Sequence, residues 1–344
     1  MTIKTVDTEN HDHYRSFSSL TDPKNFSSML DELPNDVIGI CEVAKQQTIH
    51  HNLLSYYDIP NSKWKEMNRI WPPKMTELLR ALKDTKPHNL YDDRHPEQRI
   101  IGGCILESHF LAGMLRYKNI PARIRAGYFK DIRANSTHVL RFWEKVLREK
   151  GVNEELLKED PEKWKEDINA YTGKKNDINH FIEHWICEYW DETKKRWRQL
   201  DANITFLKAH SNIDVGFHLP RKHYEYAFEA WKKMRNSDNF NPEQYAEEPQ
   251  DGRSHIRSQL LWNFFSLLNH DIAGHDQLSR DSWTFIKKKK YEEISTQELG
   301  ELDMLASLLS QEPTKDELVE FYQRCTTLRI ASAEMDPYSF VFSK

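Results

Sequence analysis

The chain has 344 residues, of which 30% are charged, 38% are hydrophobic and 12% are aromatic. That composition is typical of a globular protein with a sizeable core and excludes an intrinsically disordered chain. The net charge of −5, and the lack of an apolar run near the roughly 20 residues of a membrane span, argue against nucleic-acid and membrane binding.

The cysteines and the N-terminus indicate the compartment. Four cysteines lie far apart, and no two have the spacing of a zinc knuckle: Cys41, Cys104, Cys187 and Cys325. They predict free thiols in a reducing compartment. The first ten residues lack the apolar segment of a signal peptide, so we expect a cytoplasmic protein.

The N-terminal third is expected to be mainly helical. Residues 1–22 are polar and predict a flexible arm that precedes a core over residues 23–205. Helical periodicity predicts one helix from Asp36 to about Gln47 and another from Met75 to Leu82. His50 and His51 are adjacent and would face about 100° apart on a helix, so we expect surface or helix-end residues.

The stretch from Gly102 to Arg123 organises the rest of the chain. Two glycines permit a tight turn before Cys104, and apolar residues at helical spacing then predict a buried helix. Asn119 tolerates the left-handed conformation that ends helices, and Pro121 prevents the helix from resuming. The Cys104 thiol therefore opens a helix, where the macrodipole favours a thiolate, although residue type alone favours a buried structural cysteine.

Strands and further helices follow. Residues 122–129 alternate and predict a half-buried strand, and the charged residues 130–176 predict an insertion that covers the core. Residues 178–190 and 196–202 predict a β-hairpin that turns near 191–195. Residues 206–344 predict a helical extension packed on the core, with helices at 224–234, 255–268, 295–309 and 314–325.

The hairpin supplies partners for a nucleophile. A cysteine nucleophile needs a base and an acceptor that orients that base. His184 lies in the first strand and Asp201 lies at the end of the second. Adjacent antiparallel strands place such side chains about 5 Å apart, so the two can pair.

These motifs, in this order, resemble the transglutaminase-like superfamily, and the flanking helices are similar to uncharacterised bacterial members. The matching segments cover residues 100–203: Cys104 opening a helix, Asn119-Ile120-Pro121-Ala122-Arg123 fifteen residues later, Gly127-Tyr128, His184-Trp185, and Trp197-x-x-x-Asp201. In this chain Asn119 stands where the family has glycine, and Ile105 stands where a basic residue is frequent.

The resemblance implies an α+β fold with a papain-like core, in which the nucleophile helix packs on an antiparallel sheet between N- and C-terminal helices. It implies acyl transfer or hydrolysis through a thioester at an amide or peptide-type carbonyl, with Cys104 as nucleophile, His184 as base and Asp201 as orienting acid. The implied substrate is a peptide, a protein or a small amide, and no metal or organic cofactor is required. The Cys104 backbone N–H and one side chain, with Gln98 as a candidate, would stabilise the oxyanion.

Two alternatives remain open. His180-x-x-Glu183-His184 fits the pattern of inverted zinc peptidases, but a strand would separate the two histidines by roughly 13 Å, too far for one zinc ion. The same fold could also serve as a non-catalytic binding or scaffold module.

Overall fold

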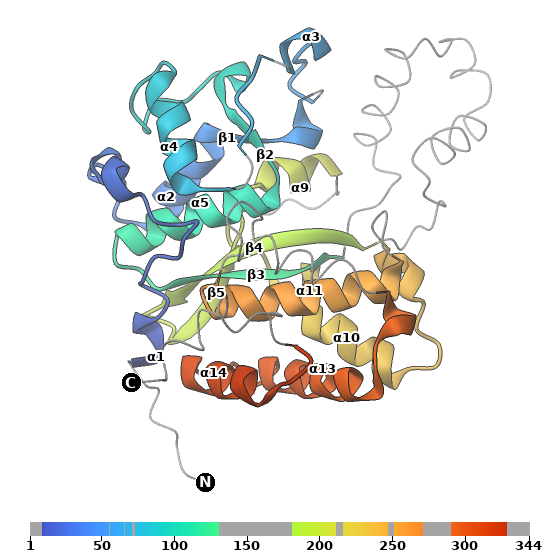
Figure 1. Cartoon of the computed structure of the whole chain (residues 1–344). Coiled ribbons are helices and arrows are strands. Elements are labelled where there is room, and N and C mark those ends of the chain that lie inside the picture. The colour runs from blue at the N-terminus through green and yellow to red at the C-terminus, as the bar shows by residue number, and fades with distance from the viewer. Residues whose placement is uncertain are drawn as a thin grey trace, which may run out of the picture.

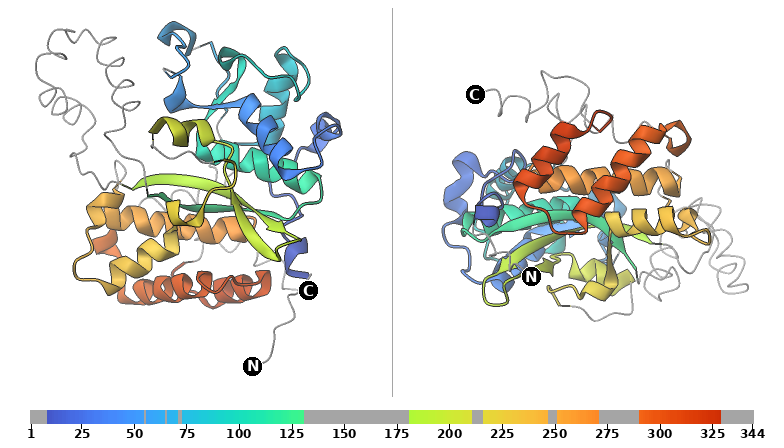
Figure 2. Two further views of the ribbon diagram at one scale, coloured as in Figure 1. Left: turned by 180° about the vertical axis from the view of Figure 1, so that it is seen from behind. Right: turned by 90° about the horizontal axis from the view of Figure 1, so that it is seen from below.

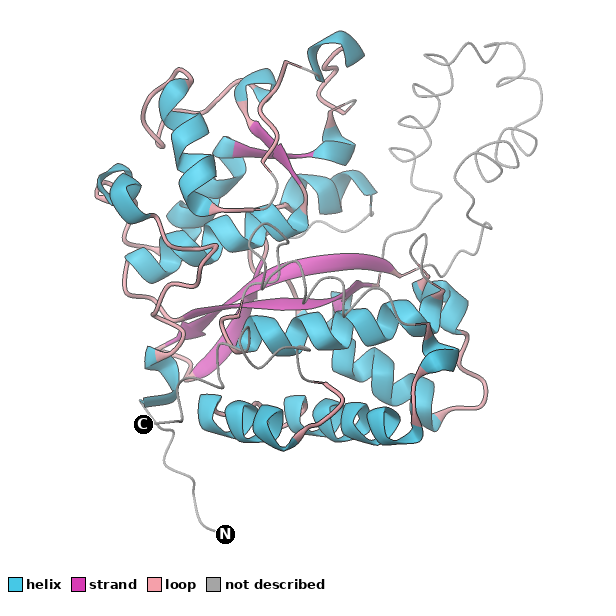
Figure 3. Ribbon diagram, in the orientation of Figure 1, coloured by secondary structure: helices cyan, strands magenta, loops and turns pink. Residues whose placement is uncertain are grey.

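The computed structural model describes residues 9–54, 56–64, 66–70, 73–130, 181–210, 216–246, 251–270 and 290–328. Residues 131–176 of the expected insertion lie outside this set. The fold is mixed α+β, with a curled antiparallel sheet between two groups of helices (Figures 1 and 3). Across the described ranges, none of the helices has the length and apolar character that crossing a membrane requires.

The central sheet has four strands in the order β5–β4–β3–β6. They are antiparallel neighbours with these bounds: β3 Ala122–Phe129, β4 Ile182–Asp191, β5 Arg196–Leu200 and β6 Tyr224–Tyr226. The expected hairpin is therefore present as β4 and β5. Strand β3 differs from the half-buried strand expected, because all eight of its residues are buried beneath helices and the neighbouring strands.

One group of helices comes from the N-terminal part of the chain and lies above the sheet in Figure 1. It includes α2 (Val37–Gln47), which is capped by the Asp36 side chain, α4 (Met75–Asp84) and α5 (Cys104–Tyr117). Asn119, just past α5, has φ 59°, the left-handed conformation expected there. Shorter helices connect these elements: η1 Lys24–Leu30, η2 His51–Leu53, α3 Asn61–Trp64 and η3 Pro96–Gln98.

A second, two-stranded sheet lies within this group. Strand β1 (Thr48–His50) pairs in parallel with β2 (Ile100–Gly102), which leads directly into α5. The helical periodicity of this region gave no signal for β1, because three residues are too few to show a strand period.

The other group of helices comes from the C-terminal part and lies below the sheet in Figure 1, as the view from behind in Figure 2 also shows. Its apolar residues join the same core cluster as α5, so the C-terminal helices pack on the core as expected. Helix α9 (Ile204–His210) instead lies above the sheet in Figure 1, and η4 (Arg221–His223) leads into β6. The elements below the sheet are α10 Ala227–Asn236, η5 Pro242–Tyr245, α11 Gly252–Leu267, η6 Tyr291–Glu293, α13 Thr296–Leu309 and α14 Lys315–Arg324.

Two expectations for these outer segments are wrong. The helix expected from Tyr224 begins only at Ala227, because residues 224–226 pair with the end of β3 as β6. Residues 1–8 of the flexible arm expected over residues 1–22 lie outside the described residues, but after α1 (Glu9–Asp12) the chain packs on the core at Tyr14 and Leu20. Tyr14 is 1% exposed and belongs to the main core, and its carbonyl oxygen accepts a hydrogen bond from the backbone N–H of Ala122.

Candidate active site

Cys104 is the first residue of α5. Gly103 is the N-cap residue, and it has no side chain to accept a hydrogen bond from the first turn. A Cβ on Gly102 would lie 2.2 Å from the Leu106 side chain, so glycine is required where β2 turns into the helix. The sulfur is half-buried at the end of α5 where the peptide dipoles favour negative charge. The structure thus places the thiol as the sequence predicts.

The other three cysteines are buried, as expected. Burial raises the pKa of the Cys41 thiol and that of the Cys187 thiol. Cys104 is therefore the cysteine best placed to react with a molecule from solution.

His184 and Asp201 form a buried pair between β4 and the end of β5. His184 Nε2 lies 2.5 Å from Asp201 Oδ2, and the two side chains are 1% and 4% exposed. Since Leu200 is the register partner of Cys187, Asp201 reaches His184 diagonally rather than from the directly opposite position. The second oxygen of Asp201 accepts the backbone N–H of Asn203 at 2.7 Å, which fixes the carboxylate.

The remaining ring nitrogen of His184 is left for Cys104, whose side chain is a hydrogen-bonding partner of His184. Burial disfavours the imidazolium, but the charge and hydrogen bond of Asp201 and those of Cys104 outweigh burial and raise the pKa of His184. Helix α5 and the hairpin therefore bring together the three predicted residues as a Cys–His–Asp set.

The backbone around His184 is held by β6. The Tyr224 hydroxyl lies 3.0 Å from the carbonyl oxygen of His184 and 3.1 Å from that of Arg125. Gly127, the register partner of His184, leaves room for this approach: a Cβ there would lie 2.3 Å from the Glu225 carbonyl oxygen and 2.8 Å from the Tyr224 hydroxyl. A glycine in a buried strand is the sequence signal for such a close approach.

Glu107 is a site residue that the sequence prediction missed. It lies one turn after Cys104 on α5 and is 4% exposed. Burial, reinforced by the charge of Asp201, raises its pKa to about 8. Its Oε1 is 3.5 Å from the Thr48 hydroxyl, and its Oε2 has no hydrogen-bond partner in the described part of the chain. A charged residue type within an apolar helix was the available signal.

A small cavity adjoins Glu107. Its volume is about 10 Å³, close to that of one water, and Glu107, Thr48, His50 and Asn203 are among its lining residues. The side-chain Nδ2 of Asn203 is buried and, within the described ranges, has no partner. Glu107, with an unpaired Oε2, and Asn203, with an unpaired Nδ2, therefore line the same water-sized cavity.

The expectation of surface or helix-end residues is confirmed for His51, which is exposed and begins η2, and is wrong for His50, which ends β1 beside Gly102 and is 6% exposed. The two rings stack at 4.3 Å. His51 Nδ1 donates to the Gly102 carbonyl oxygen at 3.0 Å. A Cβ built on Gly103 would lie 3.8 Å from His50 Nε2, so both imidazoles stand beside the start of α5.

Gln98, the side chain that the sequence offered as a candidate oxyanion donor, lies in a separate element before β2. It ends the 3-10 helix η3 and is exposed, and strand β2 separates it from Cys104. The ring of His50, by contrast, lies beside the α5 N-terminus. No local pattern in the sequence indicates this position, because it results from the pairing of β1 with β2.

The geometry of β4 also bears on the zinc motif. His180 lies outside the described residues, but Glu183 and His184 are successive strand residues whose side chains point to opposite faces. Glu183 Oε2 lies 2.9 Å from His255 Nε2, whereas His184 faces Asp201. In the described ranges, no group of three or more histidine, cysteine, aspartate or glutamate side chains is arranged to hold a metal ion.

The chain was compared with protein-family models, with curated proteins and with solved structures, and no match was found in any of the three comparisons.

Proposed function

We propose that this protein is a cysteine-dependent acyltransferase or hydrolase that acts on an amide or peptide-type carbonyl. One observation carries the proposal: a half-buried thiol at a helix N-terminus shares a histidine with a buried aspartate. The order and spacing of the three residues, together with an antiparallel sheet against the helix, support a papain-like core of the transglutaminase type.

In the first half of the reaction, Cys104 Sγ attacks the carbonyl carbon while His184 holds the thiol proton. His184 then gives that proton to the departing amine as the C–N bond breaks, which leaves a thioester on Cys104. Asp201 keeps the imidazole in one orientation and stabilises its protonated form, because its carboxylate is itself fixed by the Asn203 backbone.

In the second half, water or an amine attacks the thioester. His184 accepts a proton from the attacking group, and the thiol leaves as the acyl group is released. Water gives a hydrolase and an amine gives a transferase.

The oxyanion of each tetrahedral intermediate needs two donors. The backbone N–H of Cys104 is one, because the first N–H groups of a helix have no intrahelical acceptor. For the other we assign the ring of His50 in place of Gln98, since its Nε2 lies beside Gly103. Removing such a donor typically lowers the rate by about 100-fold or more.

Selective alkylation tests the proposal. Iodoacetamide should label Cys104 faster than Cys41, Cys187 and Cys325, as measured by peptide mapping at short times. His184→Ala should slow this labelling, whereas His218→Ala, whose imidazole contacts Tyr189, should not. Equal labelling of all accessible cysteines would favour a non-catalytic binding module instead.

Acyl-enzyme trapping tests the chemistry itself. A small activated ester such as p-nitrophenyl acetate should give a mass adduct on Cys104 that Cys104→Ala abolishes. Added amines should shorten the lifetime of the adduct in a transferase and leave it unchanged in a hydrolase. Unchanged turnover in Cys104→Ala would refute the mechanism.

A further inference from the structure

A positively lined groove lies in front of Glu188, a buried residue four positions, or about 13 Å, along β4 from His184. It consists of two cavities of about 450 and 460 Å³ that share Arg221, Tyr226 and Glu312. Two carboxylates, Glu229 and Glu312, line the cavities. The cationic lining residues are Arg125, Arg196, Arg198, Arg221, Lys232 and Lys233.

Ion pairs behind the groove wall reduce this charge without cancelling it. Arg221 pairs with Glu229 at 2.5 Å within the groove itself, and behind its wall Arg198 pairs with Asp191, Lys233 with Glu225, and Arg125 with Glu188. With the three carboxylates behind the wall and the neighbouring Arg123 included, seven cations face five anions. The groove therefore keeps a positive excess in a chain whose net charge is −5.

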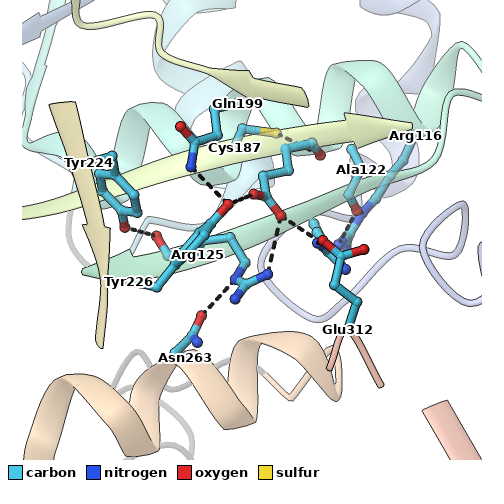
Figure 4. Close-up of polar contacts among 11 residues, drawn as sticks. Arg116, Ala122, Arg125, Cys187, Gln199, Tyr224, Tyr226, Asn263 and Glu312 are labelled. Atoms are coloured by element: carbon cyan, nitrogen blue, oxygen red, sulfur yellow. Dashed lines mark hydrogen bonds and ion pairs between the residues drawn. The ribbon is translucent and has the colours of Figure 1, made fainter. Parts of the chain in front are cut away.

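The buried wall of the groove holds two guanidinium groups on one carboxylate. Glu188 accepts from Arg123 Nε at 2.6 Å and from Arg125 Nη1 at 3.2 Å, and it also accepts the Tyr226 hydroxyl (Figure 4). All three charged side chains are 3% exposed or less. Burial opposes ionisation of Glu188, but the two arginines outweigh it and lower its pKa to about 2. One buried positive charge is left over.

Arg123 lines neither cavity, but its guanidinium lies close to Glu312, which lines both. Its Nη2 is buried and has no hydrogen-bond acceptor within the described residues. The nearest second carboxylate belongs to Glu312, at 3.8 Å from Nη2, beyond hydrogen-bond distance. Glu312 is 66% exposed and lines both cavities, so the pair is weak and its carboxylate is easily displaced.

We propose that this groove is a binding site for a small carboxylate-bearing ligand whose carboxylate replaces that of Glu312 at Arg123 Nη2. Arg221 and Lys232 at the rim would pair with further anionic groups of the ligand. The aromatic ring of Tyr226 positions two of the cationic side chains, because the guanidinium groups of Arg125 and Arg221 both lie 4.3 Å from its centroid. Binding here requires none of the Cys104, His184 and Asp201 side chains.

Calorimetric titration of the full chain with citrate, at constant ionic strength, tests the site. We expect saturable 1:1 binding with a Kd of about 1 mM or tighter. Arg221→Gln and Lys232→Gln should each weaken binding about tenfold, as expected for a lost charge-assisted hydrogen bond. Glu312→Gln should strengthen binding about threefold, because it removes the competing carboxylate.

Lys222→Gln is the matched control, since Lys222 is exposed beside Arg221 and lines neither cavity. Inorganic phosphate, titrated in parallel, should bind more weakly than citrate, and phosphate binding as tight as that of citrate would refute the choice of a carboxylate. The absence of saturable citrate binding would overturn the site. So would an affinity that Glu312→Gln leaves unchanged, or one that Lys222→Gln lowers as much as Arg221→Gln does. Binding that is lost in Cys104→Ser would place the anion at the thiol instead.

Discussion

Replacement of Glu107 by glutamine should stabilise the protein at alkaline pH and have little effect in acid. In the folded chain burial raises the pKa of Glu107 from 4.5 to about 8. Below pH 4.5 this carboxyl is protonated in both the folded and the unfolded chain, so it has no effect on stability. Between pH 4.5 and about pH 8 Glu107 loses its proton only in the unfolded chain, so the free energy of unfolding falls as the pH rises.

The size of the effect follows from the shift. Each pKa unit corresponds to 1.36 kcal/mol, so the full loss above pH 8 is about 5 kcal/mol, and between pH 5 and 8 it is about 4 kcal/mol. Glutamine has nearly the same shape as the protonated acid and keeps an acceptor for the Thr48 hydroxyl, but it does not titrate. The difference in the free energy of unfolding between Glu107→Gln and the parent chain should therefore rise by about 4 kcal/mol, in favour of the variant, from pH 5 to pH 8.

Urea denaturation at pH 5 and pH 8, followed by tryptophan fluorescence, measures this difference. Glu97→Gln, at an exposed position of η3, is the matched control and should change the free energy of unfolding by less than about 0.5 kcal/mol at either pH. A stability difference between Glu107→Gln and the parent that does not vary with pH would refute the argument that the buried carboxyl is held neutral.

Three further substitutions test the site and the fold. His50→Ala should slow acyl transfer about 100-fold but leave iodoacetamide labelling unchanged, because alkylation forms no oxyanion; a parallel loss of both rates would contradict the assignment. Gly127→Ala should lower the free energy of unfolding by about 2–3 kcal/mol in urea, since its Cβ meets the Glu225 backbone, whereas Gly300→Ala in an open helix position should be neutral or stabilising. Tyr14→Ala should lower it by about 3–4 kcal/mol, and a loss below about 1 kcal/mol would mean that the N-terminal segment is loosely held.

The sequence predicted those elements whose signals are local. The glycine pair before Cys104, the left-handed Asn119 and the alternating hairpin each specify their own backbone conformation. The contact between His184 and Asp201 could be predicted because residues on the two strands of a hairpin are neighbours. The diagonal offset of Asp201 could not, because it depends on a register that the turn alone does not determine.

The missed features depend on contacts between distant segments. His50 reaches the α5 N-terminus through a parallel pairing across about fifty residues, and β6 replaces the first turn of an expected helix because β3 offers it an edge. Tyr14 is buried only because a core formed by later residues accepts it. Local propensity does not specify such pairings, since tertiary contacts override it.

The neutral Glu107 also has a consequence for the proposed reaction. In the acyl-enzyme the thioester sulfur of Cys104 carries no charge, so Asp201 supplies the charge that stabilises the imidazolium of His184, and a second carboxylate charge on Glu107 would hold the proton of His184 more tightly. A histidine that keeps its proton is a poorer base for the water that attacks the thioester. Hydrolysis of the acyl-enzyme should therefore slow above about pH 8 in the parent chain relative to Glu107→Gln, measured as the decay of the mass adduct on Cys104. Identical pH profiles for the two proteins would show that Glu107 does not act on His184.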